Sequence, residues 1–301
     1  MDNNALQIRA QVLRTVRAFF QEEGFLEVET PLLIPANAPE EHIDPVIVSP
    51  TGQLQTSPEL CMKRLLCRGH HRIFQISRCW RAHERGSRHL SEFTMLEWYR
   101  ANADYTQLMN DCEGLLRRVA ADCAVGSLFR RDGRTIDPRL PWQRFTVQEA
   151  FRRFAAADAL TAVENDSFDE LVVSVIEPAL AELPVPSILT DYPAEMAALA
   201  RLKGDDPRYA ERFELYAGGL ELANGFSELS DPVEQRLRFG AANAVRVTRG
   251  MEPLPLPEPF LAELPALPPS AGIALGIDRL VMLTTGCATI DEVVAFTPEE
   301  L

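Results

Sequence analysis

The chain has 301 residues, of which 46% are apolar and 25% are charged, so its composition is that of an ordinary globular protein. Its 30 basic and 44 acidic residues give a net charge of −14, which argues against broad binding of nucleic acid through phosphates. No apolar run approaches the roughly 20 residues that span a bilayer, and the first residues show no export signal. We therefore expect a cytoplasmic protein with no membrane partner. Its six cysteines form no Cys-x-x-Cys pair and are expected to be reduced, packed thiols.

Apolar residues at helical spacing predict a first helix over residues 6–23, followed by a strand over 25–30. Thr56-Ser57-Pro58-Glu59 predicts the start of a helix that ends at Gly69, because it combines a hydroxyl cap, a proline in the first turn and an acidic residue. The other elements of this half are an irregular segment at 35–50, two strands at 72–81 and 92–100 that enclose a polar loop at 82–91, and a helix at 104–119.

The second half of the chain alternates helical and extended patterns. Its predicted elements are a helix at 147–154, a helical excursion at 155–185, strands at 187–192, 212–216 and 219–226, a helix at 231–249, an irregular proline-rich connection at 253–269, and a strand at 272–277 that leads into a last helix. Strands linked as hairpins and separated by helices predict an α+β fold, in which helices flank an antiparallel sheet. We expect one domain over residues 1–301.

Basic residues surround the polar loop that follows the first strand of the predicted hairpin. Arg81 lies where strand and loop meet, with Arg85, Arg88 and His89 nearby. A guanidinium on a strand can hold a phosphate or a carboxylate with two parallel hydrogen bonds. A solvated edge strand has the same pattern, so both interpretations stay open at this point.

Glutamates recur at intervals of seven residues at positions 214, 221 and 228. Clustered carboxylates repel one another, and a Mg²⁺ ion that bridges them to nucleotide phosphates would remove this repulsion. The alternative is that each glutamate faces solvent. Asn224-Gly225-Phe226 weakens this alternative, because glycine allows close approach of a ligand and asparagine offers a donor and an acceptor. Arg279 begins a helix directly after a glycine-containing strand, which is a suitable place for an anion.

Taken in order, three segments resemble the three motifs of class II aminoacyl-tRNA synthetases. They are the helix–strand unit that ends at Pro31, the Arg81 loop closed by Glu92–Tyr99, and Gly272–Arg279. Between the second and third, Glu221–Leu229 resembles the lysine-specific branch. The resemblance covers about residues 6–298. It implies the class II catalytic fold, the use of ATP and Mg²⁺, and a homodimer formed through the first motif.

Within that branch, the chain is similar to the elongation factor P β-lysine ligases, a family of lysyl-tRNA synthetase paralogues. The predicted first helix begins within ten residues, which leaves no room for an anticodon-binding domain, and Thr56–Glu59 and Ala274 match the ligase versions of these segments. The resemblance implies that (R)-β-lysine, or lysine, is activated as an acyl-adenylate and transferred to a lysine side chain of elongation factor P, with no role for tRNA. A truncated lysyl-tRNA synthetase and a non-catalytic amino-acid-sensing regulator remain as alternatives.

The same resemblance implies roles for individual residues. Arg81 and Arg279 are the expected catalytic residues, and Glu214 and Glu221 are expected to hold Mg²⁺. Phe93 is expected to stack on adenine. The expected ATP contacts are Arg81, His83, His89, Phe93, Glu221, Leu222, Gly276 and Arg279. The expected substrate contacts are Ser57, Glu59, Glu97, Tyr99, Asn224, Glu228 and Ala274.

The roles of the substrate contacts divide along the substrate. Glu59 is expected to bind the amino group near the carboxylate. Asn224 and Arg81 are expected to bind the carboxylate itself. The terminal ammonium is expected to meet Glu97, Tyr99 and Glu228.

The chain departs from the family pattern in the loop of the second motif. Trp80-Arg81-Ala82-His83 stands where the family typically has Phe-Arg-Asn-Glu, and His89-Leu90-Ser91-Glu92-Phe93 stands where it has His-Asn-Pro-Glu-Phe. These departures remove side-chain contacts to adenine and leave backbone contacts at His83 available. Because Arg81 and Phe93 are retained, we expect activity.

Overall fold

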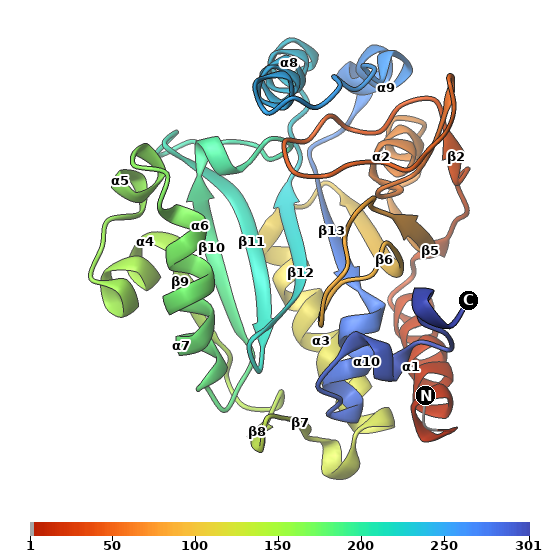
Figure 1. Cartoon of the computed structure of the whole chain (residues 1–301), viewed down its shortest axis with the longest axis vertical. Coiled ribbons are helices and arrows are strands. Elements are labelled where there is room, and N and C mark those ends of the chain that lie inside the picture. The colour runs from red at the N-terminus through yellow and green to blue at the C-terminus, as the bar shows by residue number, and fades with distance from the viewer. Residues whose placement is uncertain (1–2) are drawn as a thin grey trace.

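The computed structural model describes residues 3–301, and an eight-stranded sheet forms its centre (Figure 1). In spatial order its strands are β1 (Leu26–Glu27), β5 (Arg72–Trp80), β6 (Glu92–Ala101), β13 (Ser270–Gly276), β12 (Leu220–Ser227), β11 (Tyr209–Ala217), β10 (Ser187–Pro193) and β9 (Gln143–Thr146). The outermost pairs, β1–β5 and β9–β10, are parallel. The pairings between them are antiparallel.

Smaller elements complete the chain. Two further sheets contain β2 (Leu33–Ile34), β4 (Gly52–Leu54) and β3 (Ile47–Ser49), and β7 (Phe129–Arg131) and β8 (Arg134–Ile136). The α-helices are α1 (Asn3–Glu22), α2 (Glu59–Cys67), α3 (Tyr105–Cys123), α4 (Val147–Ala150), α5 (Ala159–Glu164), α6 (Phe168–Leu171), α7 (Glu177–Ala181), α8 (Pro232–Thr248), α9 (Glu258–Glu263) and α10 (Ile277–Thr285). Two π-helical turns, η2 (Phe151–Ala155) and η3 (Val172–Ile176), continue α4 and α6. The 3₁₀ turns are η1 (Val125–Ser127), η4 (Ala194–Met196), η5 (Leu264–Ala266), η6 (Ile290–Val293) and η7 (Pro298–Glu300).

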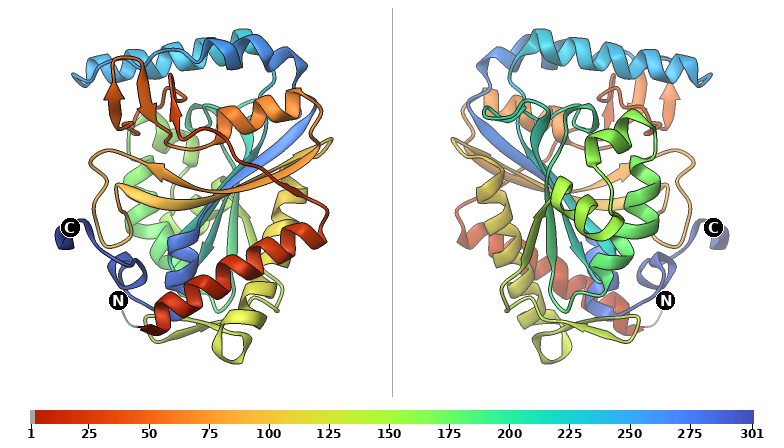
Figure 2. Two further views of the ribbon diagram at one scale, coloured as in Figure 1. Left: turned by 90° about the vertical axis from the view of Figure 1, so that its right-hand side faces the viewer. Right: turned by 90° about the vertical axis from the view of Figure 1, so that its left-hand side faces the viewer.

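One face of the large sheet is fully packed. Helices α1, α3 and α10 lie together on this side, whereas α2, α8 and α9 lie on the other (Figure 2). The apolar stripe of α1 buries Val12, Val16 and Phe20, and the Phe20 ring stacks on Phe74 of β5 with 4.9 Å between ring centroids. On β6, Trp98 points into the same core. Alternation along a strand therefore directs the neighbours of these residues to the opposite face.

That opposite face is covered only at its two ends. At one end α2, α8 and α9 form an apolar cluster with Ile73 and Tyr99 of the sheet. At the other end the helical segment from α4 to α7 packs on Phe145, Tyr192 and Tyr216. The middle of the face, on β6, β13, β12 and β11, lies between the two clusters and carries polar residues.

The predicted α+β fold is confirmed, and so is the helical excursion at 155–185, which contains α5, α6 and α7. The predicted antiparallel sheet flanked by helices is also confirmed, with the addition that its two edge strands pair in parallel. The strand expected at 25–30 shrinks to the two residues of β1. The proline-rich connection contains α9, which tolerates Pro259 because a proline in the first turn needs no intrahelical N–H bond. The short strands β2, β3, β4, β7, β8 and β9 were not predicted.

The cysteine prediction agrees with the structure, in which all six cysteines are free. Burial raises the pKa of the Cys79 thiol to about 12 and that of Cys112 well above its usual range, so these thiols stay protonated and unreactive. Within residues 3–301, none of the helices combines the length and the apolar character needed to cross a bilayer.

Candidate active site

Register across the sheet aligns residues that lie far apart in the sequence. Glu214 of β11 stands opposite Asn224 of β12, which stands opposite Ala274 of β13, and Ala274 stands opposite Glu97 of β6. Directly opposed residues point to the same face, so these four side chains form one row. The row lies on the face that α1, α3 and α10 leave open. The structure thus brings predicted metal-binding and substrate-binding residues into one site.

At the β6 end of the row, Glu97 is buried and hydrogen-bonded on both carboxylate oxygens. The Ser57 hydroxyl donates to Oε1 at 2.5 Å and the Tyr99 hydroxyl donates to Oε2 at 2.9 Å. Burial, together with the charge of Glu59, raises the pKa of Glu97 to about 8. Ser57 also accepts a hydrogen bond from the backbone N–H of Glu59 at 3.0 Å. The N-cap of α2 is nevertheless Pro58, which has no side-chain oxygen, so the predicted hydroxyl cap lies one residue before the cap position.

The innermost group of this end is Lys63, which the sequence analysis missed. Its side chain is 0% exposed, and its Nζ lies 2.5 Å from Glu59 Oε1 and 2.5 Å from Glu228 Oε2. Burial raises the pKa of Glu228 to about 8, although Lys63 opposes this shift. For Lys63, burial would lower the pKa, but the charges of Glu228 and Glu59 raise it overall, so its ammonium stays charged. Glutamate four residues before lysine is typical of an exposed helix face, so the sequence carried no signal for this position.

At the start of α10, Arg279 joins three elements. Its Nη1 donates to the backbone oxygen of Glu221 at 2.7 Å and lies 3.2 Å from Glu221 Oε2, and its Nη2 lies 2.5 Å from His89 Nε2. Burial and the Arg279 charge lower the pKa of His89. A Cβ at Gly276 would lie 3.8 Å from the Arg279 side chain, at ordinary van der Waals distance, so this strand end borders Arg279 directly. These four residues are the predicted phosphate end of the ATP site.

Arg81 is the first residue after β5. Its guanidinium carbon is 5.2 Å from the centroid of the Phe93 ring and its Nη1 is 3.8 Å from Glu84 Oε1. The Nε of Arg81 is buried without a hydrogen-bond partner. A buried unpartnered donor on a guanidinium suits an anionic ligand. His83, two residues later, has a backbone φ of 66° and so turns the loop at the point where backbone contacts to adenine were predicted.

The carboxylate of Glu214 is held by three donors. Arg212 Nη2 lies 2.6 Å from Oε1, and the hydroxyls of Tyr192 and Tyr216 each donate to Oε2 at 2.6 Å. Arg212 Nε also donates to Asn224 Oδ1 at 3.2 Å. The sequence analysis had not predicted Arg212, Tyr192 or Tyr216 as site residues.

The surroundings of Glu214 fit a hard divalent cation. Burial raises the pKa of Glu214, Arg212 opposes this and the charge of Glu221 adds to it. Burial likewise raises the pKa of Glu177 of α7, to which the charges of Glu221 and Glu214 also contribute. The charge of Glu221 thus raises the pKa of both Glu214 and Glu177, and a Mg²⁺ ion near these carboxylates would relieve the repulsion. Residues 3–301 contain no preformed cluster of three or more His, Cys, Asp or Glu side chains, so phosphate oxygens would have to complete the ligand set.

A bulge in β12 decides which of its residues reach the site. Between Leu215 and Tyr216 of β11 the register shifts, so that Glu221 pairs with Tyr216. This shift brings Glu221 to the face of Glu214. The side chain of Leu222, a predicted ATP contact, is 2% exposed and lies in the core, so only its backbone can face a ligand.

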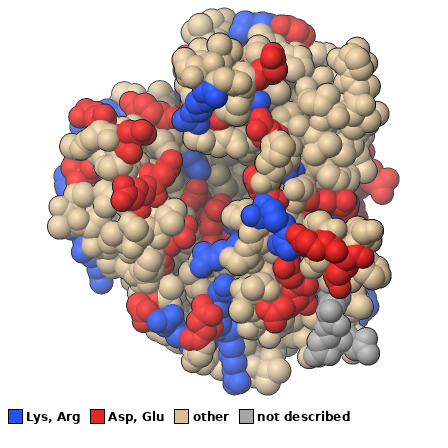
Figure 3. Space-filling view, in the orientation of Figure 1, with Lys and Arg blue, Asp and Glu red and all other residues tan. Residues whose placement is uncertain are grey.

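The segment at 35–50 contributes Glu40, another carboxyl that the sequence analysis missed. The pKa of Glu40 is raised to about 7, mainly by burial. The charge of Arg81 opposes this shift and the charge of Glu59 adds to it, so Glu40 interacts electrostatically with both residues. Figure 3 shows that acidic side chains gather in the hollowed centre of this face, with basic side chains along the hollow's edge.

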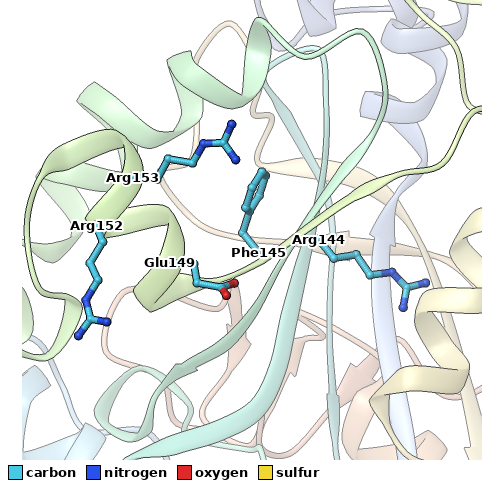
Figure 4. Close-up of a pocket in the computed structure, with 5 residues that line it drawn as sticks. All are labelled: Arg144, Phe145, Glu149, Arg152 and Arg153. Atoms are coloured by element: carbon cyan, nitrogen blue, oxygen red, sulfur yellow. The ribbon is translucent and has the colours of Figure 1, made fainter.

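A different hollow lies at the far edge of the sheet, on β9 and α4. Arg144, Phe145, Glu149, Arg152 and Arg153 line it (Figure 4). The Arg153 guanidinium lies 5.3 Å from the Phe145 ring centroid. The predicted site residues lie elsewhere.

Comparison with known proteins agrees with this geometry. Residues 2–300 match the family described as tRNA synthetases class II (D, K and N). The chain is 41% identical to an elongation factor P (R)-β-lysine ligase of Proteus mirabilis, with 96% of this chain and 93% of that protein covered. The identity to the ligase of that name from Vibrio vulnificus is 38%, over 97% and 94% of the two chains. The chain belongs to the elongation factor P (R)-β-lysine ligase family of class II synthetase-like proteins.

This membership confirms the predicted family, fold and enzyme class. The chain is an ATP-dependent ligase with a class II catalytic domain, and the regulator alternative is not supported. The roles of individual residues remain predictions, as do the single domain and the missing anticodon-binding domain.

Proposed function

We propose that the protein activates (R)-β-lysine with ATP and transfers it to a lysine side chain of elongation factor P. The observation that carries the proposal is the charge pattern of the site. Glu59, Glu97 and Glu228 gather at one end, and Arg81 with its unpartnered Nε lies toward the ATP end. A lysine-like substrate has two ammonium groups and one carboxylate, which is the complementary pattern. The ligases named among its relatives act on the same pair of substrates.

The reaction has two balanced steps. An oxygen of the substrate carboxylate attacks the α-phosphorus of ATP, the bond to pyrophosphate breaks, and an acyl-adenylate remains bound. The ε-amine of the acceptor lysine then attacks the acyl carbon, the amine loses a proton, and AMP departs. Arg81 orients the carboxylate and the α-phosphate, while Arg279 and His89 bind the outer phosphates. Positioning and fixed charge supply the catalysis.

Glu214 and Glu221 are the proposed holders of Mg²⁺, which would neutralise the charge of the nucleotide phosphates. Phe93 supplies the surface on which adenine stacks. Asn224 contributes its amide to the substrate carboxylate, with its carbonyl already engaged by Arg212. The use of ATP and the six free cysteines support a cytoplasmic location.

The test is to incubate the protein with ATP and either (R)-β-lysine or α-lysine, and then with elongation factor P or tRNA. We expect pyrophosphate exchange with the β isomer and a mass increase on elongation factor P. Charging of tRNA with no modified elongation factor P would instead support the truncated synthetase. Absence of exchange with both isomers would contradict the proposed function.

Ala274 is expected to contribute to the choice between the two isomers. It is half-buried on the floor of the site, between Asn224 and Glu97, and its methyl group faces the middle of a bound lysine chain. A methyl-sized change in a pocket alters selectivity about 10- to 200-fold. We expect Ala274→Gly to shift the ratio of kcat/KM values toward α-lysine. An unchanged ratio would show that other residues select the isomer.

We also propose a homodimer. The family resemblance puts its interface on the first motif, which ends at Pro31, and exposed apolar residues that extend this interface lie on and around the small β2–β4–β3 sheet. Leu33 is 54% exposed and Ile47 is 59% exposed, and Leu26, Leu32 and Val48 are exposed beside them.

Sedimentation at micromolar concentration is expected to give twice the 33.6 kDa mass of the chain. Leu33→Asp with Ile47→Asp should shift the protein to monomer. Val125→Asp is the control, because Val125 is 78% exposed in η1, outside this patch. A wild-type protein that sediments as monomer would contradict the dimer.

A further inference from the structure

Lys63 is a buried ammonium inside a site whose expected ligand also carries ammonium groups. It extends from α2 and reaches Glu59 and Glu228, both at 2.5 Å. Glu59 is the expected partner of the amino group near the substrate carboxylate, and Glu228 is an expected partner of the terminal ammonium. Lys63 therefore connects the two carboxylates that are expected to meet the two ammonium groups of the ligand.

The charges of this cluster can be counted from the residues that surround Lys63. Helix α2 contributes Glu59, β6 contributes Glu97 with the Tyr99 hydroxyl, and Glu228 follows β12. The Phe226 ring lies 5.1 Å from Lys63 Nζ. Glu40 from the segment at 35–50 interacts more strongly with Arg81 than with Glu59, so its charge is counted with Arg81 and not with this cluster. When Glu59, Glu97 and Glu228 are ionised, three negative charges less one positive charge leave two. Two is the number of ammonium groups on lysine or β-lysine.

We propose that Lys63 is a positioning residue that holds Glu59 and Glu228 in place and reduces the charge of the pocket to that of a diammonium substrate. The inference rests on the proposed function, because it takes a lysine isomer as the ligand. An unpaired buried charge is costly, and carboxylates without a counter-ion bind protons instead. Without Lys63, which lowers the pKa of Glu228, that carboxylate would bind a proton more tightly, and Glu59 and Glu228 would lose their common anchor. The substrate would then have to displace that proton in order to bind.

The pH dependence of binding follows from the same groups. The pKa values of Glu97 and Glu228 are both raised to about 8, so the empty pocket retains protons on this coupled pair at neutral pH. Binding of an ammonium favours the ionised carboxylates and releases a proton. The KM for the lysine isomer should therefore fall as pH rises from about 6.5 to 8.5, while the substrate ammonium groups are still charged.

The test compares Lys63→Met, Lys63→Gln and Arg64→Met by lysine-dependent pyrophosphate exchange. Arg64 is the matched control, since it is the next residue on α2 and pairs with Glu263 of α9 instead. We expect Lys63→Met and Lys63→Gln to raise the KM for (R)-β-lysine at least about tenfold at pH 7, with kcat and the KM for ATP within about threefold of wild type. The KM of both variants should also fall more steeply with pH. Arg64→Met should retain the wild-type KM and pH profile.

Two results with the Lys63 variants would overturn the inference. One is an unchanged KM and pH profile, and the other is a parallel loss of lysine and ATP binding, which indicates a general structural role.

A measurement on the unmodified protein does not depend on variant folding. Calorimetry in two buffers of different ionisation enthalpy should detect proton release when (R)-β-lysine binds at pH 7. Absence of proton release would contradict the charge balance. If the wild-type protein activates neither isomer, the proposed function fails; if it does and the variants match it, only the inference fails.

Discussion

Arg279→Ala is expected to lower ATP-dependent pyrophosphate exchange by about 10²- to 10³-fold, the usual cost of removing one fixed group that stabilises transition-state charge. The guanidinium lies at the first turn of α10, with Glu221 on one side and His89 on the other. In the proposed reaction it binds the outer phosphates of ATP, whose charge increases as pyrophosphate leaves. Its loss should therefore affect kcat and kcat/KM for ATP more than the KM for lysine.

The fold should survive this substitution. Glu221, the acidic partner of Arg279, has a side chain that is 36% exposed, so water can replace the lost contact. The pKa of His89 provides an independent readout, because the Arg279 charge is one of the causes that lower it. In the variant, the pKa of His89 measured by NMR should rise. Arg139→Ala is the control, because Arg139 pairs with Asp137 on the exposed surface. Wild-type exchange in Arg279→Ala would contradict the assignment of the third motif.

Much of the site could be predicted because its chemistry lies in short local segments. Arg81 at the end of a strand and Arg279 at the start of a helix are both visible as boundaries between periodic patterns. The structure then joins them to His89 and Glu221 as expected. What the sequence lacks is the register that brings Glu214, Asn224, Ala274 and Glu97 into one row. That row depends on hydrogen-bond pairing between strands that lie far apart in the chain, and on a bulge that turns Glu221 to the site.

The missed residues share a physical cause. Lys63 and Arg212 are charged residues in positions where a single sequence predicts solvent exposure, and only the packed structure shows the carboxylates that pair with them. The parallel edge strands were missed for a similar reason. β1 and β9 are two and four residues long, too short for a periodic signal, and their direction follows from how the chain returns to the sheet.

Gly272→Ala is expected to disable lysine binding while sparing the ATP end of the site. Gly272 lies on β13 directly opposite Tyr99. A Cβ at this position would lie 2.1 Å from Tyr99 Cε1 and 2.5 Å from Glu228 Oε1, closer than packed atoms allow. Tyr99 must therefore move, and its hydrogen bond to Glu97 will be lost or distorted. Overpacking of this kind costs about 1–3 kcal/mol.

The displaced groups are the proposed partners of the terminal ammonium, so the substitution should lower kcat/KM for (R)-β-lysine at least about 10²-fold, the usual cost of misplacing a positioning group. The ATP end should be spared, because Gly276 lies four residues further along β13, roughly 13 Å at the usual rise of a strand. Gly276→Ala makes the same change on the same face, where the nearest Arg279 atom is 3.8 Å from the added carbon. It should raise the KM for ATP and leave the KM for lysine near its wild-type value.

Gly240→Ala in α8 measures the effect of the substitution itself, because no atom lies within 4 Å of the added carbon. It should leave both KM values unchanged and stabilise the helix slightly. Opposite responses of Gly272→Ala and Gly276→Ala would divide β13 into a lysine end and an ATP end. If Gly272→Ala raised the KM values for lysine and ATP equally, the displacement caused by the clash would also distort the ATP end. The division of the site along β13 would then be wrong.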